Sequence, residues 1–256
     1  MILAIDIGNT NICVGCLDKD RVWFSEYLST DCQKTDLEYA VSLKNIMEIY
    51  RIVPEQIEGG ILSSVVPPLS HVVQRAAEKI LRRPVLTVGP GLKTGLNIQI
   101  DNPAQLGSDL VVDAVAGLAE YPLPLIIVDM GTATILSVLN QKGTYVGGAI
   151  YPGLRISLDS LTASTSQLPR ISLDNPGRSI GRNTVECMKS GILYGTAAML
   201  DGMIDRLEEE LGMKAFLVAT GEPAIPILPL CRHSIHFDKT LPLKGLLILY
   251  EKNRPR

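Results

Sequence analysis

The apolar and polar positions at the start of the chain predict a β-sheet. Runs rich in Ile, Leu and Val are separated by short polar turns, a pattern typical of strands joined by hairpins. The predicted strands cover Ile2–Ile7, Ile12–Leu17 and Val22–Ser29. The first strand carries a carboxylate, Asp6, just before a polar turn of sequence GNTN. A charged residue in this position raises the question of what the turn binds.

Helical patterns follow and then alternate with further strands. Thr35 or Asp36 is a suitable N-cap for a first helix. The segment "GGILSSVVPP" predicts a buried strand, with helices after it in "SHVVQRAAEKIL" and "GSDLVVDAVAGLAE". This alternation is typical of the α/β class. The apolar side of the first helix is predicted to carry Leu37, Val41, Met47 and Tyr50.

The second half of the chain continues the alternation. The segment "GTYVGGAIYPG" predicts a pair of strands with a Gly-Gly bend, and a polar stretch covers Asp159–Leu168. A long helix is predicted from about Thr184 to Leu211. A strand in "KAFLVATGE" and a final helix in "LKGLLILYEKN" complete the pattern.

The opening hairpin occurs again about half a chain later. In "IDIGNT" and "VDMGTAT" an apolar strand ends in Asp-x-Gly, and a second apolar strand follows. The two aspartates and the two glycines share one offset, since 129 − 6 = 123 and 131 − 8 = 123. Two copies of one hairpin at this spacing predict a duplicated domain, with residues 1–115 and 116–256 as the two halves.

Each turn has a chemical use that fits its residues. Glycine lets backbone N–H groups approach a ligand closely, and threonine and asparagine add short side-chain donors. Such a turn suits phosphate oxygens, and an aspartate beside it suits a hydrated Mg²⁺ ion. A single copy is more typical of a turn held by its own Asx hydrogen bonds. Two copies favour a nucleotide phosphate site, and the P-loop sequence is absent.

The composition excludes several classes of function. The chain has 256 residues, is 46% hydrophobic and carries a formal net charge of -3, which gives no reason to expect nucleic acid. No apolar stretch approaches the ~20 residues of a membrane helix. Met1 leads directly into the first strand, with no basic segment or cleavage site before it. These features predict a cytoplasmic protein with a sizeable core.

The cysteines and histidines give little indication of a metal site. Five cysteines, an odd number, fit a reducing compartment. Cys13 and Cys16 have CxxC spacing, but residues three apart in a strand point to opposite faces, which favours buried core cysteines. His233 and His236 lie in a segment typical of a strand, without a carboxylate partner in pattern, so a metal site there is disfavoured.

The motifs taken together resemble one known family. "DIGNTN", "TGLNIQIDNPAQLGSD", "DMGTAT", "GGAIYPG", "QLPRI", "GRNT" and "KSGILYG" occur in this order. As a set they resemble the type III pantothenate kinases, a branch of the actin/Hsp70/sugar-kinase superfold. The resemblance implies an α/β fold of two similar actin-like (ribonuclease H-like) domains, with mixed sheets flanked by helices and a nucleotide cleft between them.

The resemblance also implies an activity and its site residues. The expected reaction transfers a phosphoryl group from ATP with Mg²⁺ to pantothenate, the first step of coenzyme A biosynthesis, in a homodimer that needs K⁺ or NH₄⁺. The residues implied for ATP are Asp6, Gly8, Asn9, Thr10, Asn11, Gly131 and Thr132. Those implied for the substrate are Gly107, Ser108, Asp109, Leu110 and Thr184. Asp129 would hold the monovalent cation, and Asp6 would hold Mg²⁺ directly or through water.

Asp109 is implied as the proton acceptor. Its place in the first turn of a predicted helix supports an ionised carboxylate, because the positive end of the helix dipole lies there. An ionised carboxylate accepts the proton of an attacking hydroxyl group. An acidic residue at a helix start is also common in proteins with no such role.

The chain departs from the family pattern at the substrate and nucleobase ends. Leu110 stands where the family usually has an arginine that could pair with the pantothenate carboxylate. Arg155, Arg182 or the backbone N–H groups at the start of this helix are the candidates to replace it. Glu222 stands where a second glycine is usual. Two alternatives therefore stay open: a kinase of this fold for another small hydroxy acid or sugar, and a non-catalytic nucleotide-binding regulator.

Two glycines in the long helix bear on the oligomeric state. Gly191 and Gly195 lie one turn apart and would let another helix approach closely. Packing within the chain and a dimer contact account for this spacing equally well. The family resemblance favours the homodimer.

Overall fold

The computed structural model describes residues 1–175 and 177–254, which form two compact units. Unit 1 comprises Met1–Asn97, Asp101–Glu120 and Thr240–Arg256, and unit 2 comprises Ile98–Ile100 and Tyr121–Lys239. The expected boundary after residue 115 falls inside a helix that belongs entirely to unit 1. The C-terminal helix also belongs to unit 1 and not to the second half of the chain.

Unit 1 is built on a five-stranded mixed sheet of order β3-β2-β1-β4-β5. β1 pairs antiparallel with β2 and parallel with β4, which places Asp6 opposite Cys13 on one side and Ser63 on the other. The three opening strands are confirmed, with β2 starting one residue earlier than expected. The strands are β1 (Ile2–Ile7), β2 (Asn11–Leu17), β3 (Val22–Ser29), β4 (Gly60–Ser64) and β5 (Val85–Thr87).

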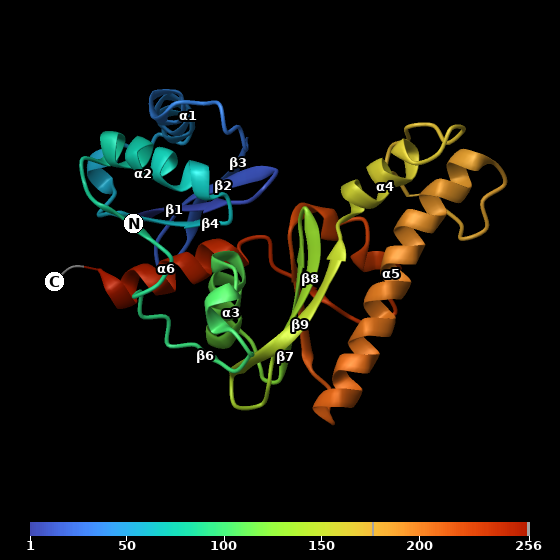
Figure 1. The fold of residues 1–256 in the computed structure, drawn as a ribbon. Coiled ribbons are helices and arrows are strands. Elements are labelled where there is room, and N and C mark those ends of the chain that lie inside the picture. The colour runs from blue at the N-terminus through green and yellow to red at the C-terminus, as the bar shows by residue number, and fades with distance from the viewer. Residues whose placement is uncertain (176, 255–256) are drawn as a thin grey trace. The chain divides into compact units, whose positions relative to one another are not determined.

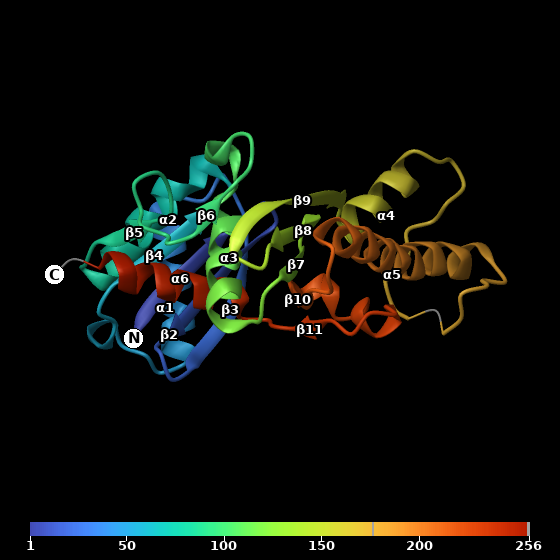
Figure 2. The same ribbon diagram turned by 90° about the horizontal axis from the view of Figure 1, so that it is seen from below.

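Helices cover both faces of this sheet. α1 (Asp36–Ile49) and α2 (Pro67–Leu81) pack together on one face, and α3 (Ser108–Glu120) and α6 (Leu241–Asn253) pack on the other (Figures 1 and 2). The prolines after β4 open α2, because proline suits the first helical turn, where no N–H donor is needed. Apolar side chains from β1, β2, β4, α1 and α2 form one continuous core.

Unit 2 repeats the sheet of unit 1. Its order is β11-β10-β7-β8-β9-β6, with β7 antiparallel to β8 and parallel to β10. Leaving out the edge strand β6, this is the order of unit 1 strand for strand, so the predicted duplication is confirmed. The strands are β6 (Asn97–Ile98), β7 (Leu125–Met130), β8 (Ala133–Leu139), β9 (Thr144–Pro152), β10 (Phe216–Thr220) and β11 (His236–Phe237).

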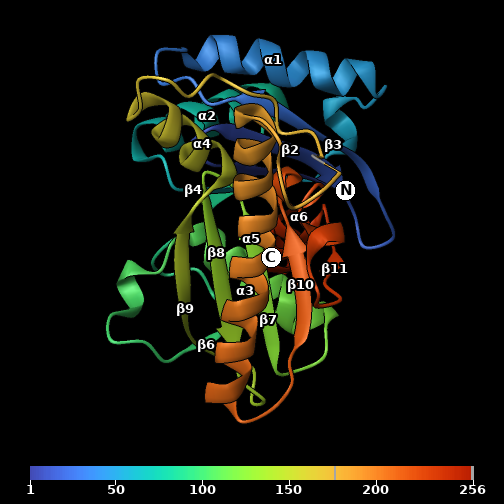
Figure 3. The ribbon, with the colours of Figure 1, turned by 90° about the vertical axis from the view of Figure 1, so that its right-hand side faces the viewer.

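One long helix covers a face of the unit 2 sheet. α5 (Thr184–Leu211) runs along the strands, and the shorter α4 (Leu154–Ala163) packs beside it (Figure 3). Leu193, Leu200 and Ile204 of α5 are fully buried against apolar residues of β7 and β8. The predicted bounds of α5 are confirmed. Short 3₁₀ turns lie at Pro54–Gln56, Pro103–Gln105, Glu222–Ala224 and Leu228–Leu230.

Two expectations from the sequence are wrong. α1 begins after an N-cap at Thr35, as expected, but its buried side carries Tyr39, Leu43 and Ile46, while Leu37 and Val41 face solvent. The segment expected to form a strand pair forms the single strand β9, which pairs with β8 along its length.

Within the described part of the chain, no helix is long and apolar enough to cross a membrane.

Candidate active site

The first polar turn links β1 to β2 in unit 1. The Gly8 N–H donates to the Asn11 carbonyl oxygen at 3.0 Å, which closes the turn. Thr30, at the end of β3, donates its hydroxyl to the Gly8 carbonyl (2.7 Å) and its backbone N–H to the Thr10 carbonyl (3.0 Å). Asn9, Thr10 and Asn11 are exposed. The hydrogen bonds from Thr30 therefore fix the turn to the end of β3, and the polar residues of the turn face solvent.

Asp6 lies on β1 directly before this turn, with one carboxylate oxygen buried. Its Oδ1 has no hydrogen-bond partner among the described residues. Burial raises the pKa of Asp6 to about 7, the nearby carboxylate of Asp109 acts in the same direction, and the Ser63 hydroxyl opposes the shift. The surroundings of the Asp6 carboxylate thus disfavour its ionised form.

The start of α3 is fastened to the end of β4. The Ser108 hydroxyl donates to the Ser64 carbonyl at 3.0 Å and accepts from the Ser64 N–H at 3.2 Å. The Ser63 hydroxyl donates to the Ser108 hydroxyl oxygen at 3.0 Å. Because β4 pairs with β1 in this region, these hydrogen bonds bring the first turn of α3 toward Asp6.

Asp109 and Leu110 follow in the same helical turn. The Leu110 N–H donates to Asp109 Oδ1 at 2.8 Å. Burial raises the pKa of Asp109, while hydrogen bonds from the Leu110 and Asp109 N–H groups partly offset this. Burial therefore outweighs these hydrogen bonds at this carboxylate. The Leu110 side chain is buried, so it offers an apolar contact where the family pattern has a cationic one.

The second polar turn links β7 to β8 in unit 2. The Gly131 N–H donates to the Ala133 carbonyl at 2.8 Å, and the Gly153 N–H donates to the Thr132 carbonyl at 3.0 Å. Gly131 is exposed, and Asp129 and Thr132 are partly exposed. This arrangement repeats the first turn, with an aspartate on the strand and a glycine two residues later.

The other predicted substrate residues lie in unit 2. Thr184 is exposed and is the first residue of α5, after an N-cap formed by Asn183. The Arg155 side chain is exposed. Its Nε lies 3.3 Å from Oδ2 of Asp159, one helical turn away on α4. Arg182 is exposed, and its backbone N–H donates to Glu186.

Comparison with known proteins decides the family. The model of the family described as type III pantothenate kinase matches residues 2–206. A type III pantothenate kinase of an Exiguobacterium species is 43% identical over 99% of this chain and 100% of its own length. The protein of the same name from Brevibacillus brevis is 41% identical over 99% of this chain and 100% of its own length. This chain belongs to the type III pantothenate kinase family.

Solved structures agree with the actin-like fold of this kinase family. The activator of 2-hydroxyisocaproyl-CoA dehydratase from Clostridium difficile, solved with bound ADPNP, matches with a TM-score of 0.57 at 14% identity. The match covers 98% of this chain and 94% of that one. Component A of the Acidaminococcus fermentans (R)-2-hydroxyglutaryl-CoA dehydratase matches with a TM-score of 0.55 at 13% identity, covering 97% and 96% of the two chains.

The pantothenate kinase motifs also imply cations, and the residues of unit 1 fit a Mg²⁺ ion. The buried Oδ1 of Asp6 has no partner among the described residues, and Asp109 adds a second carboxylate nearby. A divalent cation bound through carboxylate oxygens and water would compensate both groups. In unit 2, Asp129 is the carboxylate that would hold the monovalent cation that the resemblance implies.

Neither the place of Ser63 beside Asp6 nor the carboxylate partner of His233 was predicted from the sequence. Ser63 faces Asp6 across the β1–β4 pair, and the only signal was a polar Ser-Ser pair at the end of an apolar strand. His233 does have a carboxylate partner, Asp205, 28 positions earlier in the chain, whereas His236 packs against aromatic rings. Cys13 and Cys16 are buried thiols, as expected for core cysteines.

Proposed function

We propose that this protein transfers the γ-phosphoryl group of ATP to the hydroxyl group of pantothenate, with Asp109 accepting the hydroxyl proton. The single observation that carries the reaction is membership of the family, at 43% and 41% identity over full-length relatives. The chain is thus a kinase, a nucleotide-binding transferase of coenzyme A biosynthesis.

The proton has a defined destination in this proposal. The pantothenate oxygen forms a bond to the γ-phosphorus, the bond from that phosphorus to the β,γ-bridging oxygen breaks, and ADP leaves. Asp109 takes the hydroxyl proton as the new bond forms. A raised pKa supports this role, because a general base works best when its pKa lies near the operating pH. The Leu110 N–H, 2.8 Å from Oδ1, supports the role by orienting the carboxylate.

The two polar turns bind the phosphates of ATP. In the first turn, Asn9, Thr10 and Asn11 supply donors, and the hydrogen bonds from Thr30 hold the turn in place. In the second turn, Thr132 supplies them. Gly8 and Gly131, whose N–H groups close their own turns, let the backbone approach the phosphates closely. Asp6 holds Mg²⁺, directly or through water. The bound Mg²⁺ would neutralise phosphate charge. Asp129 holds K⁺ or NH₄⁺.

The pantothenate site lies at the start of α3, with Gly107, Ser108 and Leu110 beside the base. Thr184 contributes from the start of α5 of a second copy. The exposed face of α5 supports a homodimer, because a Cβ at Gly191 or Gly195 would meet no atom of the described residues within 4 Å, the neighbouring turns of α5 aside. Ile180 and Val185, near the same end of α5, are exposed apolar residues that a dimer contact would cover.

The test is ADP release from ATP, Mg²⁺ and pantothenate, measured in K⁺ and again in Na⁺. We expect turnover in K⁺ only, and we expect Asp109→Asn to lower kcat by about 10² or more with ATP binding retained. The control is Asp101→Asn, which removes an exposed carboxylate eight positions earlier and should leave kcat unchanged. Near wild-type turnover in Asp109→Asn would reject the base.

Two further outcomes would change the proposal in different ways. Turnover on pantothenate without K⁺ would keep the kinase and reject the cation role of Asp129. Binding of ATP with no product would point to the buried Leu110, and a panel of small hydroxy acids and sugars would then identify the acceptor.

A further inference from the structure

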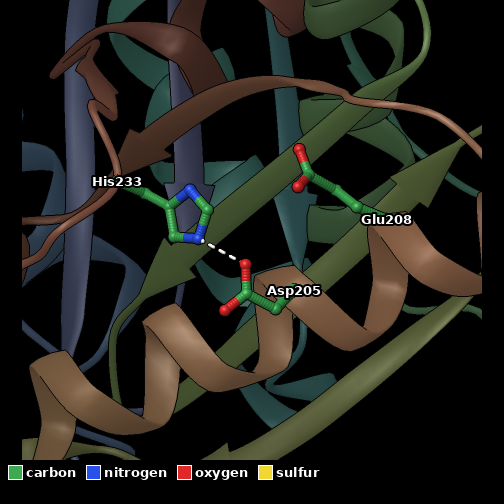
Figure 4. A group of neighbouring side chains, drawn as sticks. All are labelled: Asp205, Glu208 and His233. Carbon is green, nitrogen blue, oxygen red and sulfur yellow. Dashed lines mark hydrogen bonds and ion pairs between the residues drawn. The ribbon is translucent and has the colours of Figure 1, made fainter.

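A row of carboxylates lies along one side of α5 in unit 2, and none of them has a role in the proposed reaction. Asp201, Asp205 and Glu208 are spaced four and three residues apart, so they project from the same helix face. Figure 4 shows Asp205 and Glu208 on the side of α5 that faces the loop carrying His233. Two carboxylates and one imidazole therefore gather at this place in unit 2.

The loop before β11 is fixed on the first of these carboxylates. Asp201 is buried and accepts the backbone N–H of Arg232 at 3.0 and 2.9 Å and that of His233 at 3.1 Å. These bonds hold the backbone of His233 against α5. Its ring then lies with Nε2 3.0 Å from Asp205 Oδ1. The imidazole is therefore placed beside the carboxylates before any ligand arrives.

The third residue of the cluster, Glu208, is buried and already pairs with the ammonium group of Lys214. The Glu208 side chain is 6% exposed, and its carboxylate accepts the Ala215 N–H at 3.0 Å. The Lys214 ammonium group lies 2.5 Å from Oε2, although its side chain is 79% exposed. This bond raises the pKa of Lys214, which is the expected effect of a carboxylate partner. Because the Lys214 side chain is exposed, a metal ion that binds the Glu208 carboxylate can displace its ammonium group.

We propose that Asp205, Glu208 and His233 bind a divalent transition-metal ion of the Zn²⁺ type, which fastens α5 to the segment before β11. One ligand atom from each residue lies within 4.8 Å of the other two. Zn²⁺ binds imidazole nitrogen and carboxylate oxygen at about 2.0–2.2 Å in tetrahedral geometry, so its ligand atoms lie about 3.3–3.6 Å apart. Metal binding therefore requires the Asp205 and Glu208 side chains to rotate toward each other and toward His233.

The ligand types decide between classes of metal. One imidazole with two carboxylates suits Zn²⁺ and its neighbours in the transition series, whereas Mg²⁺ and Ca²⁺ prefer oxygen ligands alone. Three protein ligands leave a fourth position for water. His233 also borders an open cavity of about 400 Å³ with apolar walls that include Leu228 and Phe237. Solvent reaches the cluster, because the Asp205 side chain is 58% exposed.

The test uses the full-length protein after removal of metal with a chelator. Calorimetric titration with Zn²⁺ should show one saturable site in the wild type, and His233→Ala and Asp205→Asn should each weaken it at least tenfold. The control is His71→Ala, which removes an exposed histidine of α2 and should leave the affinity unchanged. Equal affinity in the wild type and His233→Ala, or no saturable binding, would overturn the proposal.

Two readouts distinguish this site from metal binding by cysteine and from a role in the kinase reaction. Co²⁺ should give visible absorption that His233→Ala removes, and a thiolate-to-metal absorption band would overturn the proposal by showing cysteine ligation. Zn²⁺ should raise the melting temperature of the wild type but not of His233→Ala. His233→Ala should keep its kinase turnover, so a failure here leaves the proposed function untouched. Glu208→Gln is not used, because it also removes the partner of Lys214.

Discussion

At the scale of single residues, Asp6 connects stability to function. Burial and the neighbouring Asp109 raise its pKa from 3.8 to about 7. Between these two values the folded protein binds more protons than the unfolded chain, so stability falls as the pH rises through this range. Above pH 7 the folded protein carries a buried charge at a cost in free energy. A bound cation would remove this cost, which couples cation binding to ionisation of Asp6.

We expect Asp6→Asn to stabilise the protein and to abolish its kinase activity. At pH 8, without nucleotide or Mg²⁺, the free energy of unfolding should rise by roughly 1–4 kcal/mol, because asparagine carries no charge. Near pH 4 the difference should vanish, since aspartate is then protonated in the fold. Urea denaturation at both pH values measures the effect.

The matched control for this experiment is Asp18→Asn. The Asp18 carboxylate accepts the Trp23 Nε1–H at 2.9 Å, and this bond holds its pKa below the usual value. Its removal should not raise stability at pH 8. The same response in both variants would show that a general change of charge, and not the burial of Asp6, causes the effect.

At the scale of elements, the turn after β10 supports the second phosphate turn. Gly221 has a φ of +89°, and a Cβ there would overlap the carbonyl oxygen of Met130, the residue before Gly131. Gly212, after α5, has a φ of +71° but no atom within 4 Å of its Cβ position. Gly212 lies in the left-handed helical region (ψ +13°), whereas Gly221 (ψ +138°) lies in a region that glycine alone occupies readily, so backbone strain and steric overlap both act at Gly221.

We expect Gly212→Ala to cost about 1 kcal/mol of stability, the penalty for a left-handed conformation alone. Gly221→Ala should cost roughly 2–4 kcal/mol, because Met130 must also move. The Michaelis constant for ATP should rise in Gly221→Ala alone. Urea denaturation and steady-state kinetics measure these effects. Equal stability losses would show that the contact with Met130 is unimportant.

The elements also show how far the sequence could predict the structure. Strands β1 and β7 and the bounds of α5 followed from apolar runs and clear caps, and Asp6 and Asp129 followed from the repeat. The buried face of α1 could not be read from apolar residues, because this helix buries Tyr39 and exposes Leu37 and Val41. Glycines suggested a bend in β9, yet pairing with β8 keeps the strand continuous.

Side-chain partners were hardest to predict, since they depend on segments far apart in the chain. Ser63 reaches the site through strand pairing with β1, and Ser108 binds Ser64 across 44 positions. His233 meets Asp205 only because the loop before β11 returns to α5. No local pattern in the sequence identifies the partner in any of these pairs.

At the scale of the whole molecule, duplication gives two sheets of the same order, each with an aspartate on its first strand. The copies have since acquired different surroundings. In unit 1, a helix start brings a second carboxylate toward the aspartate, which suits proton transfer. In unit 2, the long helix α5 keeps Gly191 and Gly195 open on its outer face. The proposed homodimer would use this open face.

We expect Gly195→Arg to convert a homodimer into a monomer of 27.8 kDa, as measured by light scattering. The open space beside Gly195 means that the change should leave the fold intact, because no described atom outside the neighbouring turns of α5 lies within 4 Å of the new Cβ. Glu210→Lys, at an exposed position of the same helix, changes charge without entering this surface and should remain dimeric. If Thr184 of one copy completes the site of the other, turnover falls together with the dimer. A monomeric wild type would remove both the assembly and this role of Thr184, while full turnover in a monomeric Gly195→Arg would remove only the latter.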